Sequence, residues 1–202
     1  MARPRLHTED VRRELLHQAT TLLAAEGPSG ITIRRVADAA GTSPPAVYDL
    51  IGDKTALVRE LFLHGFRRLH QLFEEVPTTA DPVADLLGLG LAYRASALEN
   101  PHLYDVMFAC PFPEFRPTDA DLTESMQTFS QLVERVRTAI GAGAIANGDP
   151  LDVALVLFAQ AHGLASLELK GWLGQPAEAD QRWQLSLAAM LAGMRAPAGP
   201  NE

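Results

Sequence analysis

The chain of 202 residues has little cysteine, and its single thiol, Cys110, has no second cysteine with which to form an internal disulfide. That usage fits a reducing compartment, so we expect a cytoplasmic protein. No run of about 18 apolar residues free of polar groups occurs, and no transmembrane helix or other membrane association is therefore expected. The first residues are charged and lack the apolar core that a signal peptide carries.

Alternating runs of Val, Ile and Thr are also absent, so we expect no strands. The chain has no His-x-x-x-His, no paired cysteines, no Gly-x-Ser-x-Gly and no phosphate-binding glycine loop. His64 and His70 would face different sides of a helix, and Asp119 and Asp121 suit helix capping. We therefore expect no enzyme, no cofactor and no metal site.

Basic residues are also fewer than acidic ones, so the formal net charge is −8. This excess of acidic residues is confined to the second part of the chain. Residues 1–60 hold 8 Lys/Arg and 8 Asp/Glu, whereas residues 61–202 hold 9 Lys/Arg and 17 Asp/Glu. Attraction to phosphate depends on local charge, so the acidic second part does not exclude DNA binding by the first. The balance does predict modest affinity for nonspecific DNA.

What the chain does have is a pattern of two short helices joined by a tight turn, in residues 31–57. Apolar residues recur at helical spacing in the first of them, namely Ile33, Val36, Ala37 and Ala40. Gly41 is typical of a helix that ends in a left-handed turn, Ser43 can cap the next helix, and Pro44 suits its first position. This geometry places a second helix in the major groove of DNA.

The segment resembles the DNA-binding domain of the TetR family of transcriptional regulators. The residues that match the family pattern at fixed spacing are Thr32, Ile33, Arg34, Val36, Ala37, Ala40, Gly41, Ser43, Tyr48 and Lys54. The family's usual valine after the glycine is Thr42 here, and its phenylalanine is Ile51. The resemblance implies an all-α protein, in which an N-terminal three-helix DNA-binding domain precedes a helical ligand-binding and dimerisation domain.

The resemblance also implies which residues contact DNA. They are Thr32, Arg34, Ser43, Pro44, Pro45, Tyr48, Asp49 and Lys54. Thr32 is alternatively a plain helix cap, and Tyr48 a partly buried helical tyrosine. Asp49 departs from the family, because a carboxylate near phosphates is unfavourable unless it pairs with an arginine or accepts from a cytosine amine. Arg3 and Arg5 form either an arm in the minor groove or a disordered tail.

Apolar periodicity and capping residues predict seven further helices. Their expected bounds are residues 8–25 with Thr8 as cap, 54–76 with Asp53 as cap, 82–98, 102–109, 118–145, 150–169 and 180–195. Pro111, Pro113 and Pro117 predict an irregular segment between the fourth and fifth of these. We expect a DNA-binding domain over 1–53, a ligand-binding and dimerisation domain over 54–195, and a disordered tail over 196–202.

The two last helices are candidates for the dimer interface because the first of them is apolar nearly all round. The expected interface residues are Leu155, Phe158, His162, Trp183, Leu187, Met190, Leu191 and Met194; the alternative is a core within one chain. For the effector we expect an apolar cavity lined by Tyr93, Tyr104, Met107, Phe108, Phe112, Phe115, Met126 and Phe129. Ordinary core packing is the alternative for each, and we interpret His162 as a hydrogen-bonded histidine and Cys110 as an inert thiol.

The predicted function is that of a TetR-like repressor, released from a palindromic DNA operator by a small hydrophobic molecule and acting as a homodimer. The segment Gln160–Trp172 resembles a C-terminal domain type named after a Trp-His-Gly motif, although Ala161 stands here in place of the tryptophan. The alternative function is a helical adaptor that binds only protein. In that case the exposed face of Arg34, Tyr48 and Lys54 would be incidental.

Overall fold

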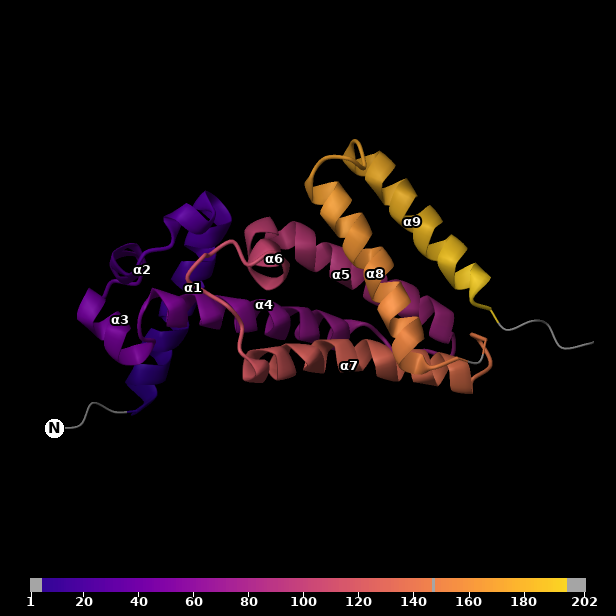
Figure 1. Cartoon of the computed structure of the whole chain (residues 1–202), viewed down its shortest axis with the longest axis horizontal. Helices are drawn as coiled ribbons and strands as arrows, with labels where there is room; N and C mark the ends of the chain where they lie inside the picture. The colour runs from indigo at the N-terminus through magenta and orange to yellow at the C-terminus, as the bar shows by residue number, and fades with distance from the viewer. Residues whose placement is uncertain (1–4, 147, 196–202) are drawn as a thin grey trace, which may run out of the picture. The chain divides into compact units, whose positions relative to one another are not determined.

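The computed structural model describes residues 5–146 and 148–195, and every regular element within them is helical (Figure 1). The α-helices are α1 Arg5–Glu26, α2 Ile33–Ala39, α3 Pro44–Leu50, α4 Lys54–Glu75, α5 Pro82–Glu99, α6 Pro101–Phe108, α7 Asp119–Gly141, α8 Pro150–Leu169 and α9 Pro176–Gly193. A short 3₁₀ turn, Pro28–Gly30, follows α1. The all-α expectation is confirmed, and the expected tail over 196–202 lies outside the described residues.

Several helix ends lie where capping chemistry predicts them. The Thr32 side chain accepts a hydrogen bond from the Arg35 N–H at 3.3 Å at the start of α2. Asp53 accepts from the Ala56 N–H at 2.9 Å at the start of α4. These side chains satisfy backbone donors that the first helical turn leaves unpaired.

Three predicted helix ends are wrong. α1 begins at Arg5, so Thr8 lies inside the helix and is not its cap. α9 begins at Pro176, because the Glu178 carboxylate accepts from the Gln175 N–H at 2.9 Å and a proline suits the first helical position. α7 ends at Gly141, and Gly143 then takes a φ of 69°, a conformation in which a side chain would be strained.

The chain divides into two compact units. The first comprises the described residues up to Arg67 together with Asn100–Ser125; the second comprises Arg68–Glu99 together with the described residues from Met126 on. This division differs from the expected boundary after residue 53, because the first part of α4 and all of α6 pack with α1, α2 and α3.

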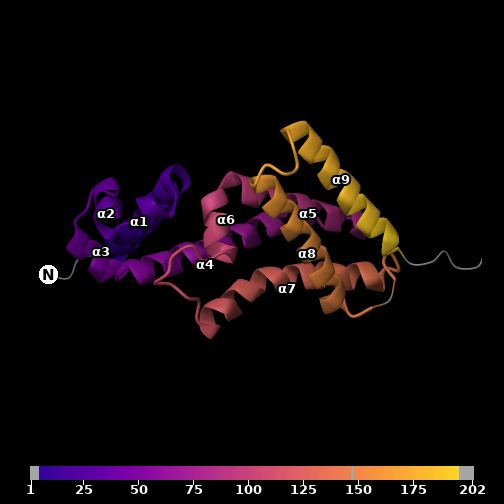
Figure 2. The same ribbon diagram turned by 45° about the horizontal axis from the view of Figure 1, so that its top comes forward.

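Each unit has its own apolar core. In the first, the buried stripe of α1 packs on α2, α3, α4 and α6, and it consists of Leu15, Ala19 and Leu23. In the second, α8 packs against α5, and α9 contacts both (Figure 2). Small side chains of α8, Ala154, Ala161 and Ala165, let these helices approach closely.

α8 is long and apolar enough to cross a membrane, judged by length and composition alone. Only 22% of its apolar window is buried within the chain, and core or interface helices of soluble proteins have the same composition. The helix therefore leaves apolar surface uncovered on a single protomer.

Candidate nucleic-acid interface

The turn between α2 and α3 has the predicted geometry. Gly41 takes a φ of 63°, and the Thr42 N–H donates to the Ala37 carbonyl at 2.9 Å, which closes α2. Ser43 precedes α3 in extended conformation, but its hydroxyl makes no capping hydrogen bond. The reason is local: Pro45 has no N–H, and the Ala46 N–H donates to the Ser43 backbone carbonyl at 2.9 Å.

The two faces of α3 differ sharply in exposure. Val47 is fully buried in the core of the first unit, whereas Tyr48 is 56% exposed and Asp49 is also exposed. Ser43 and Pro45 are exposed as well, and Pro44 is half-buried. The short helix is thus anchored on one side and presents a tyrosine, a carboxylate and a proline on the other.

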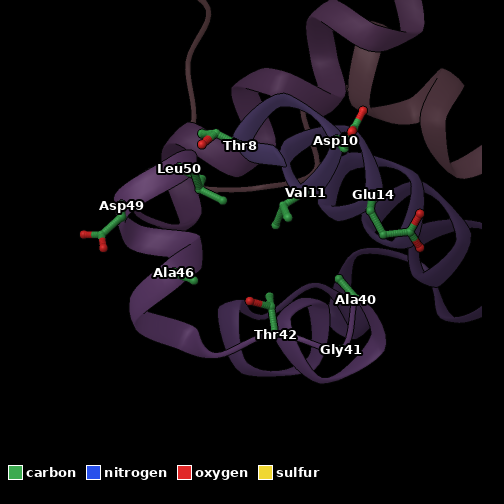
Figure 3. A pocket seen from close by; sticks show the side chains of 10 residues that line it. All are labelled: Thr8, Asp10, Val11, Glu14, Ala40, Gly41, Thr42, Ala46, Asp49 and Leu50. Atoms are coloured by element: carbon green, nitrogen blue, oxygen red, sulfur yellow. The ribbon is translucent and has the colours of Figure 1, made fainter. Parts of the chain in front are cut away.

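A shallow pocket of about 480 Å³ lies behind α3, between α1 and the turn (Figure 3). Val11 and Ala46 face it, while the carboxylates of Asp10, Glu14 and Asp49 at its rim point away from it. Asp49 makes no ion pair with any described residue. Its charge therefore lies on the outer surface of α3, where the prediction that it reads a base stays a prediction.

The two arginines of α2 have different surroundings. Arg35 forms two hydrogen bonds with the Glu26 carboxylate, so its charge is matched within the unit. The Arg34 side chain is 86% exposed and has only a loose contact of 3.9 Å with Asp38. Thr32 is exposed beside them. Arg34 is accordingly the arginine of this helix that is available to an external partner.

Lys54 has a partner that the sequence did not suggest. Its Nζ lies 2.7 Å from Glu114 Oε1 and 5.3 Å from the centre of the Phe112 ring. The hydrogen bond from Lys54 lowers the pKa of Glu114 below its ordinary value. Glu114 was missed because it lies in the proline-rich segment 60 residues further along the chain, where no periodic signal relates it to α4.

The residues expected to line one effector cavity are divided between the two units. In the first unit, Phe112 and Phe115 are buried in the core, where Phe115 lies 5.6 Å from Phe62 between ring centres. Tyr104 and Met107 of α6 are buried too, and Phe108 packs 5.6 Å from Phe66. Gly65 makes room for this packing, since a Cβ there would meet Met107 at 2.6 Å.

In the second unit an aromatic cluster joins α5, α7 and α8. Tyr93 Oη and His162 Nδ1 form a hydrogen bond of 2.9 Å, which confirms the interpretation of His162 as a hydrogen-bonded histidine. The Phe158 ring lies 5.8 Å from Tyr93 and 6.0 Å from Phe129 between ring centres. Burial lowers the pKa of His162, which keeps its imidazole neutral near pH 7. Met126 is half exposed.

The residues expected at the dimer interface fall into two groups. Trp183, Leu187 and Leu191 are buried inside the protomer, where they pack α9 onto its own unit. Leu155 is 47% exposed, while Phe158, His162, Met190 and Met194 are half-buried. Helical spacing in α9 therefore identified the inward face, and the outward face carries Leu185, which is 72% exposed.

Known proteins resemble both parts of the chain. Residues 15–61 match the family described as bacterial regulatory proteins, tetR family, and residues 86–190, just over half of the chain, match the tetracyclin repressor-like C-terminal domain. The chain belongs to the TetR family. Its members are DNA-binding transcriptional regulators, and the helix-turn-helix geometry of α2 and α3 agrees with that function.

Individual proteins resemble about half of the chain or more. The probable acrEF/envCD operon repressor of Escherichia coli K12 is 29% identical over 170 residues, 80% of this chain and 76% of that one. The transcriptional repressor KstR2 of Mycobacterium tuberculosis is 36% identical over 101 residues, 48% of each chain. A solved structure from Rhodococcus sp. RHA1, of unknown function, has a TM-score of 0.80 at 29% identity, covering 91% and 95% of the two chains.

Proposed function

We propose that this TetR-family regulator is a cytoplasmic repressor that binds a near-palindromic operator as a homodimer and leaves it when a small hydrophobic molecule binds. The observation that carries the proposal is the exposure of Tyr48 on a helix whose other side is held by buried Val47. A rigid helix with an outward polar surface is what major-groove recognition requires. Two relatives named as repressors support repression rather than activation.

In this proposal the contacts divide by chemistry. The hydroxyls of Tyr48, Thr32 and Ser43 donate hydrogen bonds to phosphates. Arg34 and Lys54 form ion pairs with phosphates. Pro44 and Pro45 have no side-chain donor, so they pack on thymine methyl groups, while Asp49 accepts from a cytosine amine. Each half-site is thus read by few groups, and specificity depends on two copies about 34–36 Å apart.

The proposed dimer forms on the uncovered faces of α8 and α9. Apolar side chains exposed along them are Leu151, Leu155, Val156, Leu167 and Leu185. An exposed apolar surface of this kind on a regulator indicates a protein partner, and a second copy of the same face satisfies two-fold symmetry. Trp183, Leu187 and Leu191 support this interface from inside by fixing α9 on its own unit.

The proposed effector is a small, largely apolar molecule with a polar group. The aromatic cluster of Tyr93, Phe129, Phe158 and His162, which lies within the second unit, suits such a molecule. We propose no catalytic role for these groups. The narrower resemblance of Gln160–Trp172 to the Trp-His-Gly type of C-terminal domain stays a prediction.

Selection of duplexes from a random-sequence pool by the purified protein tests the function directly. We expect the recovered duplexes to share an inverted repeat, and Tyr48→Ala with Lys54→Ala to abolish their retention while leaving the dimer intact in sedimentation. A matched control removes an exposed aromatic and a lysine elsewhere, with Trp172→Ala and Lys170→Ala. Unenriched duplexes, or equal loss in both double variants, would favour the protein-only adaptor.

A further inference from the structure

The ion pair of Lys54 and Glu114 lies at the start of α4, within the first unit. The two side chains are 41% and 35% exposed, so the pair is accessible from solvent. The Phe112 ring lies beneath the ammonium group and is itself buried. Lys54 is therefore held from two sides by the segment that connects α6 and α7.

That segment and the first turn of α7 are each fixed to α4. Phe115 is buried against Phe62 one residue after Glu114. Asp121, only 1% exposed, accepts from Arg59 Nε at 2.5 Å. Because buried Phe115 anchors the backbone next to Glu114, we expect the ion pair to break when Lys54 turns toward another partner.

Lys54 also occupies an electrostatically unusual position. It is the first residue of α4, where the helix dipole already contributes positive charge and disfavours a cation. Anions are therefore favoured at this point. In the protein alone Asp53 caps the helix and the Glu114 carboxylate pairs with Lys54. Since the pKa of Glu114 is lowered by Lys54, the carboxylate stays ionised throughout the pH range in which DNA binding is measured.

We propose that Glu114 is an internal competitor of the DNA phosphate for Lys54 and thereby limits operator affinity. The inference rests on the proposed function, which assigns Lys54 to a phosphate. DNA binding then exchanges one anion for another at the α4 start, rather than adding an unopposed contact. Removal of the Glu114 carboxylate leaves Lys54 without an ion-pair partner until DNA arrives, which strengthens binding.

The experiment compares wild type, Glu114→Gln, Lys54→Gln and the double variant on a selected operator duplex, by fluorescence anisotropy between about 50 and 200 mM salt. We expect Glu114→Gln to bind about two- to fivefold more tightly per half-site, the range of an exposed ion pair. The slope of log affinity against log salt should steepen by about one per half-site. Neither change should occur when Lys54 is already glutamine.

Glu124→Gln is the matched control. Glu124 pairs at 2.6 Å with Arg67, which lies on α4 about 20 Å further along the helix than Lys54. It should leave DNA affinity unchanged. Unchanged or weaker DNA binding by Glu114→Gln overturns the proposal. A gain in affinity that persists in the double variant with Lys54→Gln, or that Glu124→Gln equals, also overturns it, because long-range repulsion of DNA by the carboxylate then explains the gain. A wild-type protein that binds no duplex refutes the proposed function instead.

Discussion

The carboxylate of Glu168 on α8, whose side chain is 11% exposed, gives the sharpest test of how the second unit is held together. It accepts hydrogen bonds from Arg94 Nε at 2.8 Å, from Arg94 Nη2 at 2.6 Å and from the Trp183 indole N–H at 2.6 Å. Arg94 also pairs with Asp180 at 2.6 Å and lies 5.6 Å from the centre of the Trp183 ring. One network therefore joins α5, α8 and α9.

Replacing Glu168 with glutamine keeps the shape of the side chain but removes its charge. Arg94, whose side chain is 13% exposed, is then left with Asp180, which is 59% exposed, as its remaining carboxylate. Breaking a buried ion pair costs about 3–5 kcal/mol, and a hydrogen bond to a charged group contributes about 1.5–3 kcal/mol. Because Asp180 and one amide oxygen remain, we expect the free energy of unfolding to fall by about 2–4 kcal/mol.

Urea unfolding followed by far-ultraviolet circular dichroism measures this loss, at one protein concentration because the chain is proposed to dimerise. With a slope near 2 kcal/mol/M, the midpoint should fall by about 1–2 M. Glu134→Gln, which removes the carboxylate of the exposed pair with Arg137, should leave the midpoint unchanged. A loss below about 0.5 kcal/mol in Glu168→Gln, or equal shifts in the two variants, would refute the reasoning.

Substitutions at Gly65, His162 and Leu185 test the packing, the burial and the proposed interface separately. Gly65→Leu should destabilise the protein by about 1–3 kcal/mol by displacing Met107, and Met107→Ala in the same chain should restore part of the loss in thermal unfolding. Burial lowers the pKa of His162, so the unfolded chain takes up the proton first and stability falls as the pH drops below about 6.5. Urea midpoints across that range should fall more steeply for wild type than for His162→Gln, and equal slopes would contradict the assignment. Leu185→Glu should weaken the dimer about tenfold or more in sedimentation, with the protomer's helical content unchanged, because it buries a charge at the proposed interface; an unaltered dimer would move the interface elsewhere.

The helices could be predicted because their signals are local. Periodic apolar residues, Gly41 in its left-handed turn and the caps at Thr32 and Asp53 all act within a few residues of the backbone they organise. The same locality explains the errors. The last helix was expected to begin at residue 180, but the capping pair of Gln175 and Glu178 starts α9 four residues earlier, at Pro176.

Most contacts of the site could not be predicted from local sequence signals. Tyr48 was placed on the exposed face of its helix, as helical periodicity allows. Periodicity identifies an apolar stripe but not the surface that covers it, so Trp183 was assigned to a partner although it is buried within its own chain. The pairing of Lys54 with Glu114 depends on the tertiary fold, because the two residues are 60 positions apart.

Charge in the first unit explains how an acidic protein of this kind can bind DNA selectively. Several cations of the first unit are already matched by carboxylates, in the pairs Arg12–Glu60, Arg35–Glu26, Lys54–Glu114 and Arg59–Asp121. Arg34 keeps only a loose contact, and the other proposed phosphate contacts, such as Tyr48, are neutral. Each phosphate neutralised by an unpaired cation adds about −0.9 to the salt slope, whereas neutral donors add almost nothing. Binding should therefore depend weakly on salt and be poor on nonspecific DNA, so that the fit of α3 to its operator decides where the protein binds.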